Sequence, residues 1–286
     1  MSRYDRLLAH EFATLRHQFS RRDTILYALG VGAGVDELDL IYEPRLVAIP
    51  SMAAVLAYPG NWYADPAVEL DGRLTVHGSE RIEIHTVLPV AGDVSATPRI
   101  IAIHDKGPGR GAVVVSQREL RDTVSGALVA TVTQRAFCRA DGGMGGPEHA
   151  VPPALPMPQR SADRTLMMPT SPRAAAIYRL MGDDNPLHID PSYAESAGFS
   201  KPVLHGLASF GHICRAMLRG VAASRLRMMD CRFVAPVYPG ETLEIDLWET
   251  ASEINFRARV GLRVVIDSGQ VLLAPDVPQP PGATKD

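Results

Sequence analysis

Residues 178–218 read YRLMGDDNPLHIDPSYAESAGFSKPVLHGLASFGHICRAML, and they combine a short polar loop with two predicted helices. Gly182 and Pro186 interrupt the segment, so we expect a loop between them and not a continuous helix. Asp190 followed by Pro191 has the pattern of an N-cap residue with proline at the first helical position. This pattern predicts a short helix from residue 191 that ends at Gly198.

A second helix is predicted to begin near His205 and Gly206. Its apolar residues recur at helical spacing, and Gly220 is placed to end it. These apolar residues are Leu207, Phe210, Ile213, Met217 and Leu218. A helix that begins with glycine can offer an unobstructed backbone N–H to a developing oxyanion, so Gly206 is the candidate oxyanion donor.

The loop places a carboxylate, Asp183, and an imidazole, His188, within six residues of each other. Such a pair suits proton transfer next to a carbonyl group. Asn185 lies between them and can both donate and accept hydrogen bonds, so it can orient a water molecule or a substrate amide. The loop contains no serine, cysteine or lysine nucleophile, which disfavours covalent catalysis. No metal is expected, because His188 has no partner at ligand spacing.

The motif G-D-x-N-P-L-H-x-D-P, followed by Ala194 and then H-G-L, closely resembles the signature of the R-specific enoyl-CoA hydratases (type 2) and MaoC-like dehydratases. The match covers about forty residues closely, and weaker similarity extends over most of the chain. The resemblance implies an α+β double hotdog fold, in which each half wraps a curved antiparallel sheet around a long central helix. It also implies a cofactor-free enzyme that acts on acyl-CoA thioesters, with coenzyme A as part of the substrate, and that forms a homodimer.

The resemblance also assigns roles to individual residues. Asp183 and His188 form the acid–base pair, with Asn185 holding the water. Further residues become candidates for substrate binding, although Asp184 is expected to face solvent and HGSE replaces the usual family sequence HGEQ. These candidates are His77, Gly78, Lys106, Asp184, Pro186, Leu187 and Phe233. Lys106 can meet a coenzyme A phosphate as a point charge.

Composition narrows the class of protein. The chain has 286 residues, is 46% hydrophobic and 21% charged, and carries a formal net charge of −3. A chain without a basic stripe is not expected to bind nucleic acid. No run approaches the roughly 18 apolar residues that a membrane span needs, and the N-terminus lacks a signal-peptide core. The three scattered cysteines, Cys138, Cys214 and Cys231, indicate reduced thiols and a cytoplasmic location.

The order of predicted elements indicates a duplication. In the first half a helix is expected from Asp23, its N-cap, and a buried helix at residues 50–58. Four strands follow, at 81–88, 99–105, 111–120 and 128–139, with turns at 91–93, 105–111 and 122–126. In the second half strands are expected at 225–237, 241–250, 254–267 and 270–275. A Tyr-x-Leu pattern followed by glycine occurs in both halves, at Tyr27 and Tyr178.

The predicted domains are an N-terminal repeat at 1–145 that binds the acyl chain and coenzyme A without catalysis, a Pro- and Gly-rich linker at 146–160, and a catalytic repeat at 161–286. Residues 1–20 are expected to be an extended lead-in or a short helix, and 277–286 a disordered tail. The glycines at 30, 32 and 34 do not have the G-x-G-x-x-G spacing of a dinucleotide site. His205 and His212 are expected to be structural.

Two other functions remain open from the sequence. A hotdog thioesterase would use a carboxylate to direct water at the thioester carbonyl, although the Asn-Pro-Leu-His sequence after Asp183 argues against it. A non-catalytic acyl-CoA-binding subunit would scaffold a catalytic partner, although a purely structural repeat should have lost its acid and base. The leading interpretation is an R-specific hydratase that converts a trans-2-enoyl-CoA into a (3R)-3-hydroxyacyl-CoA, reversibly, in fatty-acid or sterol side-chain β-oxidation.

Overall fold

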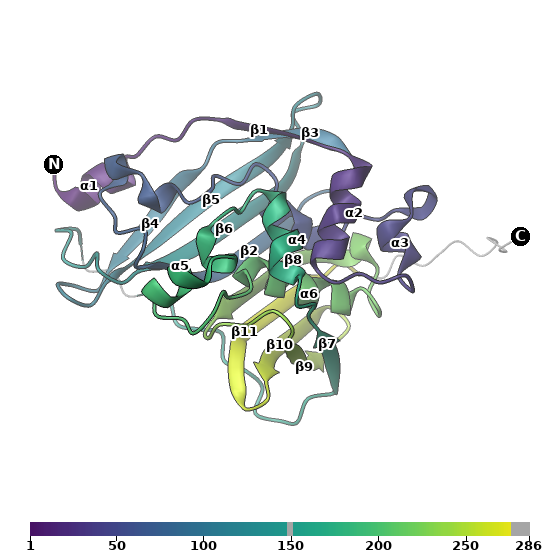
Figure 1. The fold of residues 1–286 in the computed structure, drawn as a ribbon. Helices are drawn as coiled ribbons and strands as arrows, with labels where there is room; N and C mark the ends of the chain where they lie inside the picture. The colour runs from purple at the N-terminus through teal and green to yellow at the C-terminus, as the bar shows by residue number, and fades with distance from the viewer. Residues whose placement is uncertain (148–150, 276–286) are drawn as a thin grey trace, which may run out of the picture.

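The computed structural model describes residues 1–147 and 151–275, and one antiparallel sheet dominates them (Figure 1). Within these residues the sheet has eleven strands. They are β1 (Leu15–Phe19), β2 (Thr75–Ile84), β3 (Gly92–Ala96), β4 (Arg99–Asp105), β5 (Ala112–Asp122), β6 (Leu128–Cys138), β7 (Arg164–Pro169), β8 (Leu226–Phe233), β9 (Thr242–Glu249), β10 (Glu253–Val260) and β11 (Arg263–Leu273). The helices are α1 (Arg3–Leu8), α2 (Arg21–Gly30), α3 (Leu38–Ile41), α4 (Ala174–Tyr178), α5 (Pro191–Ser196) and α6 (Gly206–Met217).

Strand order makes the internal duplication plain. The sheet runs β1-β3-β5-β6-β2 through the first half and β8-β11-β10-β9-β7 through the second. Read from each outer edge, β7, β9, β10, β11 and β8 therefore repeat the places of β1, β3, β5, β6 and β2. The strand β4 lies outside this order and pairs with β5. The two halves join where β2 pairs with β8, from Ser79 opposite Arg232 to Glu83 opposite Met228.

The repeated tyrosines meet at the centre of the molecule. Tyr27 on α2 and Tyr178 on α4 are both fully buried, and their ring centroids lie 6.1 Å apart. Both halves contribute to the main hydrophobic core around them, which also contains Phe210 and Phe256. A smaller second core lies under α1 and includes Trp62. The shared core makes the two repeats one packing unit.

The two halves differ in their central helix. In the second half α6 has twelve residues, and nearly all of them are buried, as expected for a helix enclosed on every side. The helix predicted at residues 50–58, and the long central helix that the resemblance implies for the first half, are both wrong. A five-residue 3-10 helix, Pro50–Ala54, stands there instead. Pro59 follows shortly after this 3-10 helix. Proline disfavours a helical conformation in the residue before it and has no N–H to donate to a helical hydrogen bond.

Other local predictions need correction. The N-cap of α2 is Ser20, with Asp23 at the third helical position in a capping box, so Asp23 is one turn inside the helix. The expected strand at 254–267 is a hairpin, because Gly261 adopts a left-handed φ of 58° and turns the chain between β10 and β11. Residues 91–93 were expected to form a turn, but β3 begins at Gly92. The strands β1, β3 and β7 are short, and the sequence pattern did not predict them.

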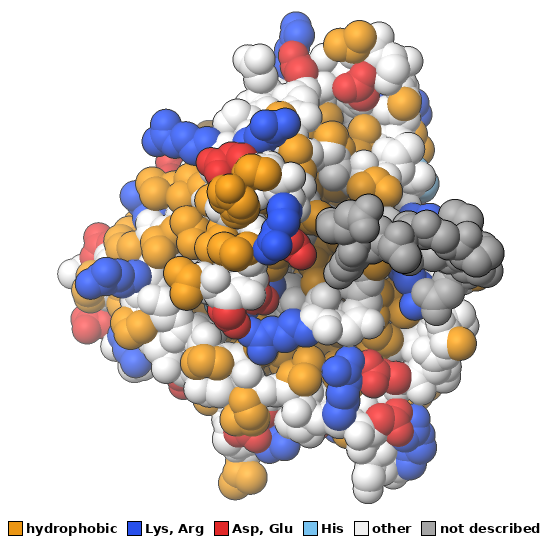
Figure 2. Space-filling view, turned by 90° about the vertical axis from the view of Figure 1, so that its right-hand side faces the viewer, with side chains coloured by type: hydrophobic (Ala, Val, Ile, Leu, Met, Phe, Trp, Pro, Cys, Tyr) orange, Lys and Arg blue, Asp and Glu red, His pale blue; other side chains and the backbone are white. Residues whose placement is uncertain are grey.

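Residues between β6 and β7 that the structure describes contain no helix or strand, as the linker prediction expects, while residues 148–150 and the predicted tail lie outside the described ranges. Across the described chain, no helix combines the length and apolar character needed to cross a membrane. Figure 2 shows hydrophobic side chains gathered over a broad area on the left of its view, with charged side chains in and around it.

Close packing of α2 on α6 depends on Gly211. A Cβ at this position would overlap Val31 and lie 2.8 Å from the Tyr27 hydroxyl oxygen. We therefore expect Gly211→Ala to lower the free energy of unfolding by about 1–3 kcal/mol, although alanine favours helix more than glycine does. Urea denaturation measures the change. Ser209→Ala, in the same helix and without added atoms, is the matched control, and equal stability of the two variants would contradict this packing.

Candidate active site

The polar loop is held by its own side chains. Asn185 is the N-cap of a 3-10 turn, Pro186–His188, and its Oδ1 accepts a hydrogen bond from Leu187 N at 3.0 Å. Asp190 is the N-cap of α5, where its carboxylate accepts from Ser192 N at 2.8 Å. The predicted cap at Asp190 and the short helix after it are therefore confirmed. Since the Asn185 oxygen is engaged in capping, its NH₂ group is the part left to donate.

His188 is oriented by a backbone carbonyl. Its Nδ1 lies 2.8 Å from Val203 O, and a carbonyl can only accept, so Nδ1 carries the proton. The other ring nitrogen, Nε2, is then unprotonated in the neutral ring and able to act as a base. His188 is buried, and this burial lowers its pKa, although the nearby Asp183 carboxylate opposes the shift. The ring is thus neutral near pH 7.

His205 contacts both catalytic candidates, Asp183 and His188. The structural role expected for His205 did not include these contacts. Its ring stacks on His188 with centroids 3.6 Å apart. Its Nε2 donates to the backbone carbonyl of Asp183 at 3.2 Å, which ties that loop to the start of α6. Burial lowers the pKa of His205 to about 2, so the ring remains neutral.

Asp183, His188 and His205 form the one group of potential metal ligands found among the described residues, with ligand atoms within 4.8 Å of one another. The stacked rings argue against a metal centre. Imidazole binds a metal through a lone pair in its ring plane, and the two ring planes are only 24° apart with centroids 3.6 Å apart. The lone pairs therefore point along neighbouring planes and do not converge on one ion. The cluster is better suited to proton transfer.

One cavity of about 270 Å³ brings the two halves of the chain together. Seven predicted residues line it, namely Asp183, Asn185, Leu187, His188, Gly206, Phe233 and His77. Gly206 is the first residue of α6, where backbone N–H groups lack a helical partner. The ring of Phe233 lies 3.4 Å from the position of a Cβ on Gly206, so the glycine keeps the cavity open beside its N–H.

The remaining predicted residues lie outside this lining. Asp184 and Pro186 are exposed to solvent. Gly78 occupies a bulge in β2 beside His77, where a Cβ would approach Arg135 O at 3.1 Å. Lys106 places its Nζ 4.2 Å from the ring centroid of Phe137.

The first half contributes polar side chains that the sequence did not predict. Tyr58, Asn61, Tyr63, Gln134 and Arg139 all line the cavity. The Tyr63 hydroxyl donates to Gln134 Oε1 at 2.8 Å, and the Gln134 amide approaches the ring of His77. His77 in turn contacts the buried Glu80 carboxylate at 3.0 Å. No motif marks these residues, because they come from separate strands and turns.

His212 in α6 predicts a pH dependence of stability. Its Nδ1 donates to Ala208 O at 2.8 Å, and burial lowers its pKa to about 4, below the ordinary 6.5. Between these values the unfolded chain binds a proton that the folded chain does not, so stability falls as pH falls from about 6.5 towards 4. Urea denaturation at pH 7 and pH 5 should show a smaller difference for His212→Gln than for the wild type. An unchanged difference would contradict the assignment.

Comparison with known proteins places the chain in a family. Residues 17–140 match the model of the MFE-2 hydratase 2 N-terminal domain, and residues 154–269 match the MaoC like domain. The chain is 39% identical over 269 residues to 3-hydroxyacyl-thioester dehydratase Y of Mycobacterium tuberculosis, covering 89% of this chain and 92% of that protein. It is 31% identical to the probable enoyl-CoA hydratase 2 of Dictyostelium discoideum, covering 94% and 96%. The protein belongs to the family of hydratase 2 enzymes and MaoC-like dehydratases.

Solved structures agree with this membership. The MaoC-like dehydratase from Phytophthora capsici superimposes with a TM-score of 0.84 at 30% identity, covering 96% of this chain and 99% of that one. A Mycobacterium tuberculosis protein described as having a double hotdog fold matches with a TM-score of 0.57 at 14% identity, which bears on the fold alone. The α+β double hotdog prediction and the family resemblance are confirmed.

Proposed function

We propose that this protein adds water to a trans-2-enoyl-CoA to give a (3R)-3-hydroxyacyl-CoA, and that it catalyses the reverse dehydration. The observation that carries the proposal is the joint placement of Asp183, His188 and the first N–H of α6 around one cavity. The names of the relatives support it, since they include a hydroxyacyl-thioester dehydratase and a probable enoyl-CoA hydratase. A role in the β-oxidation of fatty acids or sterol side chains is part of the proposal and rests on the family resemblance.

The chemistry needs a base, an acid and a site for negative charge. One member of the Asp183–His188 pair removes a proton from water, and the water oxygen forms a bond to C3 of the enoyl group. The π electrons move to the thioester oxygen, where the Gly206 N–H stabilises the enolate-like charge. The other member of the pair, which enters the reaction carrying a proton, delivers it to C2, and the proton taken from water then restores the starting protonation of the pair. In dehydration each group performs the reverse of its task in hydration, so both take part in each direction of the reaction.

The amide of Asn185 completes the proposed site. With its oxygen engaged by Leu187 N, its NH₂ group can hold the attacking water against the pair. His77, Leu187 and Phe233 are proposed to contact the substrate, because they line the same cavity. The reaction as written consumes only water and needs no cofactor beyond the coenzyme A of the substrate. The N-terminal repeat is proposed to bind substrate without supplying the acid or the base.

Location and assembly are further parts of the proposal. All three cysteines are unpaired and buried, which supports a reducing compartment such as the cytoplasm. A homodimer is proposed from the family resemblance, and sedimentation equilibrium of the full chain tests it.

A panel of trans-2-enoyl-CoA substrates of different acyl size tests the activity. Mass spectrometry should show addition of one water to the intact thioester, and a thiol reagent should detect no free coenzyme A. Release of free thiol would indicate a thioesterase instead. Unchanged substrate at every acyl size, with coenzyme A still bound, would favour a non-catalytic binding subunit.

A further inference from the structure

The cavity extends from the catalytic residues along β2 and β6. Phe233 connects the start of α6 with β2. Its ring lies beside Gly206, and its ring centroid is 4.7 Å from that of His77. His77 pairs with Ala136 across the β2–β6 ladder, and both residues line the cavity. Arg139 lines it three residues beyond Ala136, which corresponds to about 10 Å along a strand.

The pairing of the two strands continues as far as Arg139. Val76 and Thr75 lie opposite Phe137 and Cys138, and Arg139 N donates to Leu74 O at 3.2 Å. Thr75 and Val76 also line the cavity, while Arg139 itself is exposed. Arg139 is therefore an exposed residue of the same cavity that Gly206 lines.

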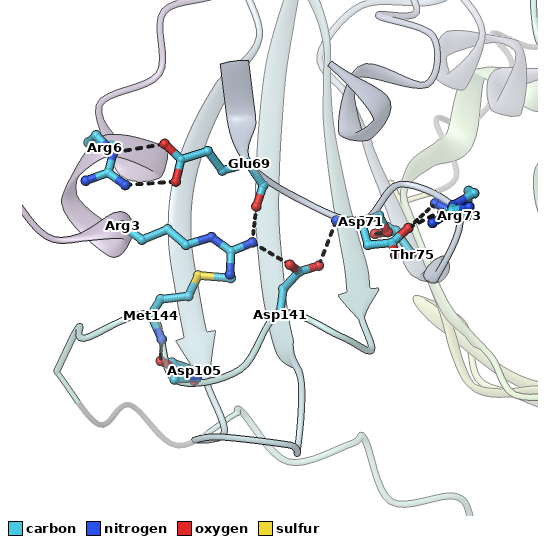
Figure 3. Close-up of polar contacts among 10 residues, drawn as sticks. Arg3, Arg6, Glu69, Asp71, Arg73, Thr75, Asp105, Asp141 and Met144 are labelled. Atoms are coloured by element: carbon cyan, nitrogen blue, oxygen red, sulfur yellow. Dashed lines mark hydrogen bonds and ion pairs between the residues drawn. The ribbon is translucent and has the colours of Figure 1, made fainter. Parts of the chain in front are cut away.

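Among the residues that the structure describes, Arg139 has no anionic partner. Its guanidinium makes no hydrogen bond or ion pair with the rest of the described chain. The neighbouring carboxylates are already engaged (Figure 3). Asp141 forms an ion pair with Arg3 and accepts from Asp71 N at 3.2 Å, and Asp71 pairs with Arg73 at 3.5 Å. An unpaired cation at the exit of a cavity is suited to an anionic group on the ligand.

Lys106, the lysine expected to meet a phosphate, is placed differently. It lies over the ring of Phe137, whereas the cavity is lined by Gln134 and Ala136. Lys106 is not among the residues that line the cavity, whereas Arg139 is.

We propose that Arg139 binds the phosphate that ends the pantetheine arm of the thioester substrate. The inference rests on the proposed function and assigns it a specificity-determining residue. Guanidinium groups recognise phosphate oxygens through paired, charge-assisted hydrogen bonds. This phosphate is shared by two sources, because it begins the diphosphate of coenzyme A and also links phosphopantetheine to an acyl carrier protein. If Arg139 binds this phosphate, the KM of a thioester whose carrier lacks phosphate should not depend on Arg139.

Steady-state kinetics with one enoyl group on three carriers tests the proposal. The carriers are coenzyme A, 4′-phosphopantetheine and pantetheine, which has no phosphate. Arg139→Gln should raise KM about tenfold for the two phosphorylated carriers, with kcat unchanged, and leave KM for the pantetheine thioester unaltered. Arg139→Lys should recover part of the loss, and Arg22→Gln, at an exposed arginine outside the cavity lining, is the matched control that should behave as the wild type.

Several outcomes would overturn the assignment. An equal change in KM for all three carriers, or none for any, would remove Arg139 from phosphate binding. A change with coenzyme A alone would move the contact to a phosphate further along that molecule. Calorimetric titration with coenzyme A and with pantetheine applies the same comparison to binding. If the wild type hydrates no thioester, the proposed function fails, and the titration still decides whether Arg139 recognises phosphate.

Discussion

Asp183→Asn is expected to lower kcat for enoyl-CoA hydration by about 10²–10⁴, the range for losing one positioned proton carrier. The amide has the shape of the carboxylate but cannot exchange a proton with water or substrate. The loop itself should survive, because His205 holds the backbone carbonyl of residue 183 and not its side chain. His188→Asn should cause a loss of similar size, since Asn can still donate to Val203 O but offers no basic nitrogen in place of Nε2. Steady-state rates measure both.

The neighbouring carboxylate provides the control for this experiment. Asp184 is exposed and lies outside the cavity lining, so Asp184→Asn should keep nearly the wild-type rate. Thermal unfolding of all three variants checks that the fold is intact. Near-normal turnover by a folded Asp183→Asn or His188→Asn variant would remove that residue from the mechanism.

Gly206→Pro should lower kcat by about 10²–10³, because proline removes the backbone N–H proposed to bind the oxyanion. Proline is favoured at the first position of a helix, where its missing N–H costs no helical hydrogen bond. The preceding residue, His205, already has extended angles of φ −55° and ψ 135°, which a following proline accepts. The helix should therefore form while one donor is lost.

Gly206→Ala separates loss of the donor from added bulk. Alanine keeps the N–H, and its Cβ would meet the Phe233 ring at 3.4 Å, an ordinary contact distance. We expect its kcat to stay within a few-fold of the wild type. Equal losses in Gly206→Ala and Gly206→Pro would show that steric fit, and not the donor, explains the effect.

The loop proposed to be catalytic could be predicted from sequence because its geometry is local. Gly182, Pro186 and Asp190 fix turns and caps over a few residues, and the proposed acid and base lie within the same segment. The first residue of α6 could be predicted for the same reason. The structural role expected for His205 stays a prediction, and its stacking on His188 depends on how two segments meet, which the local sequence does not specify.

The wall of the cavity from the first half could not be predicted in this way. Gln134 and Arg139 reach it only through the alignment of β2 with β6 and of β2 with β8, which spans long sequence separations. The sequence predicts one strand where the structure has the hairpin of β10 and β11, because strand-forming residues occur on both sides of Gly261. The sequence wrongly predicts a helix at residues 50–58 because these residues are apolar. A buried 3-10 helix has the same apolar composition, so the pattern does not distinguish the two.

The configuration of the product tests the central claim most directly. Wild-type protein and a trans-2-enoyl-CoA should give an intact 3-hydroxyacyl-CoA, and chiral chromatography of its released acid should show the 3R enantiomer alone. Formation of the 3S enantiomer, or of free coenzyme A and the unsaturated acid, would contradict hydration by the Asp183–His188 pair.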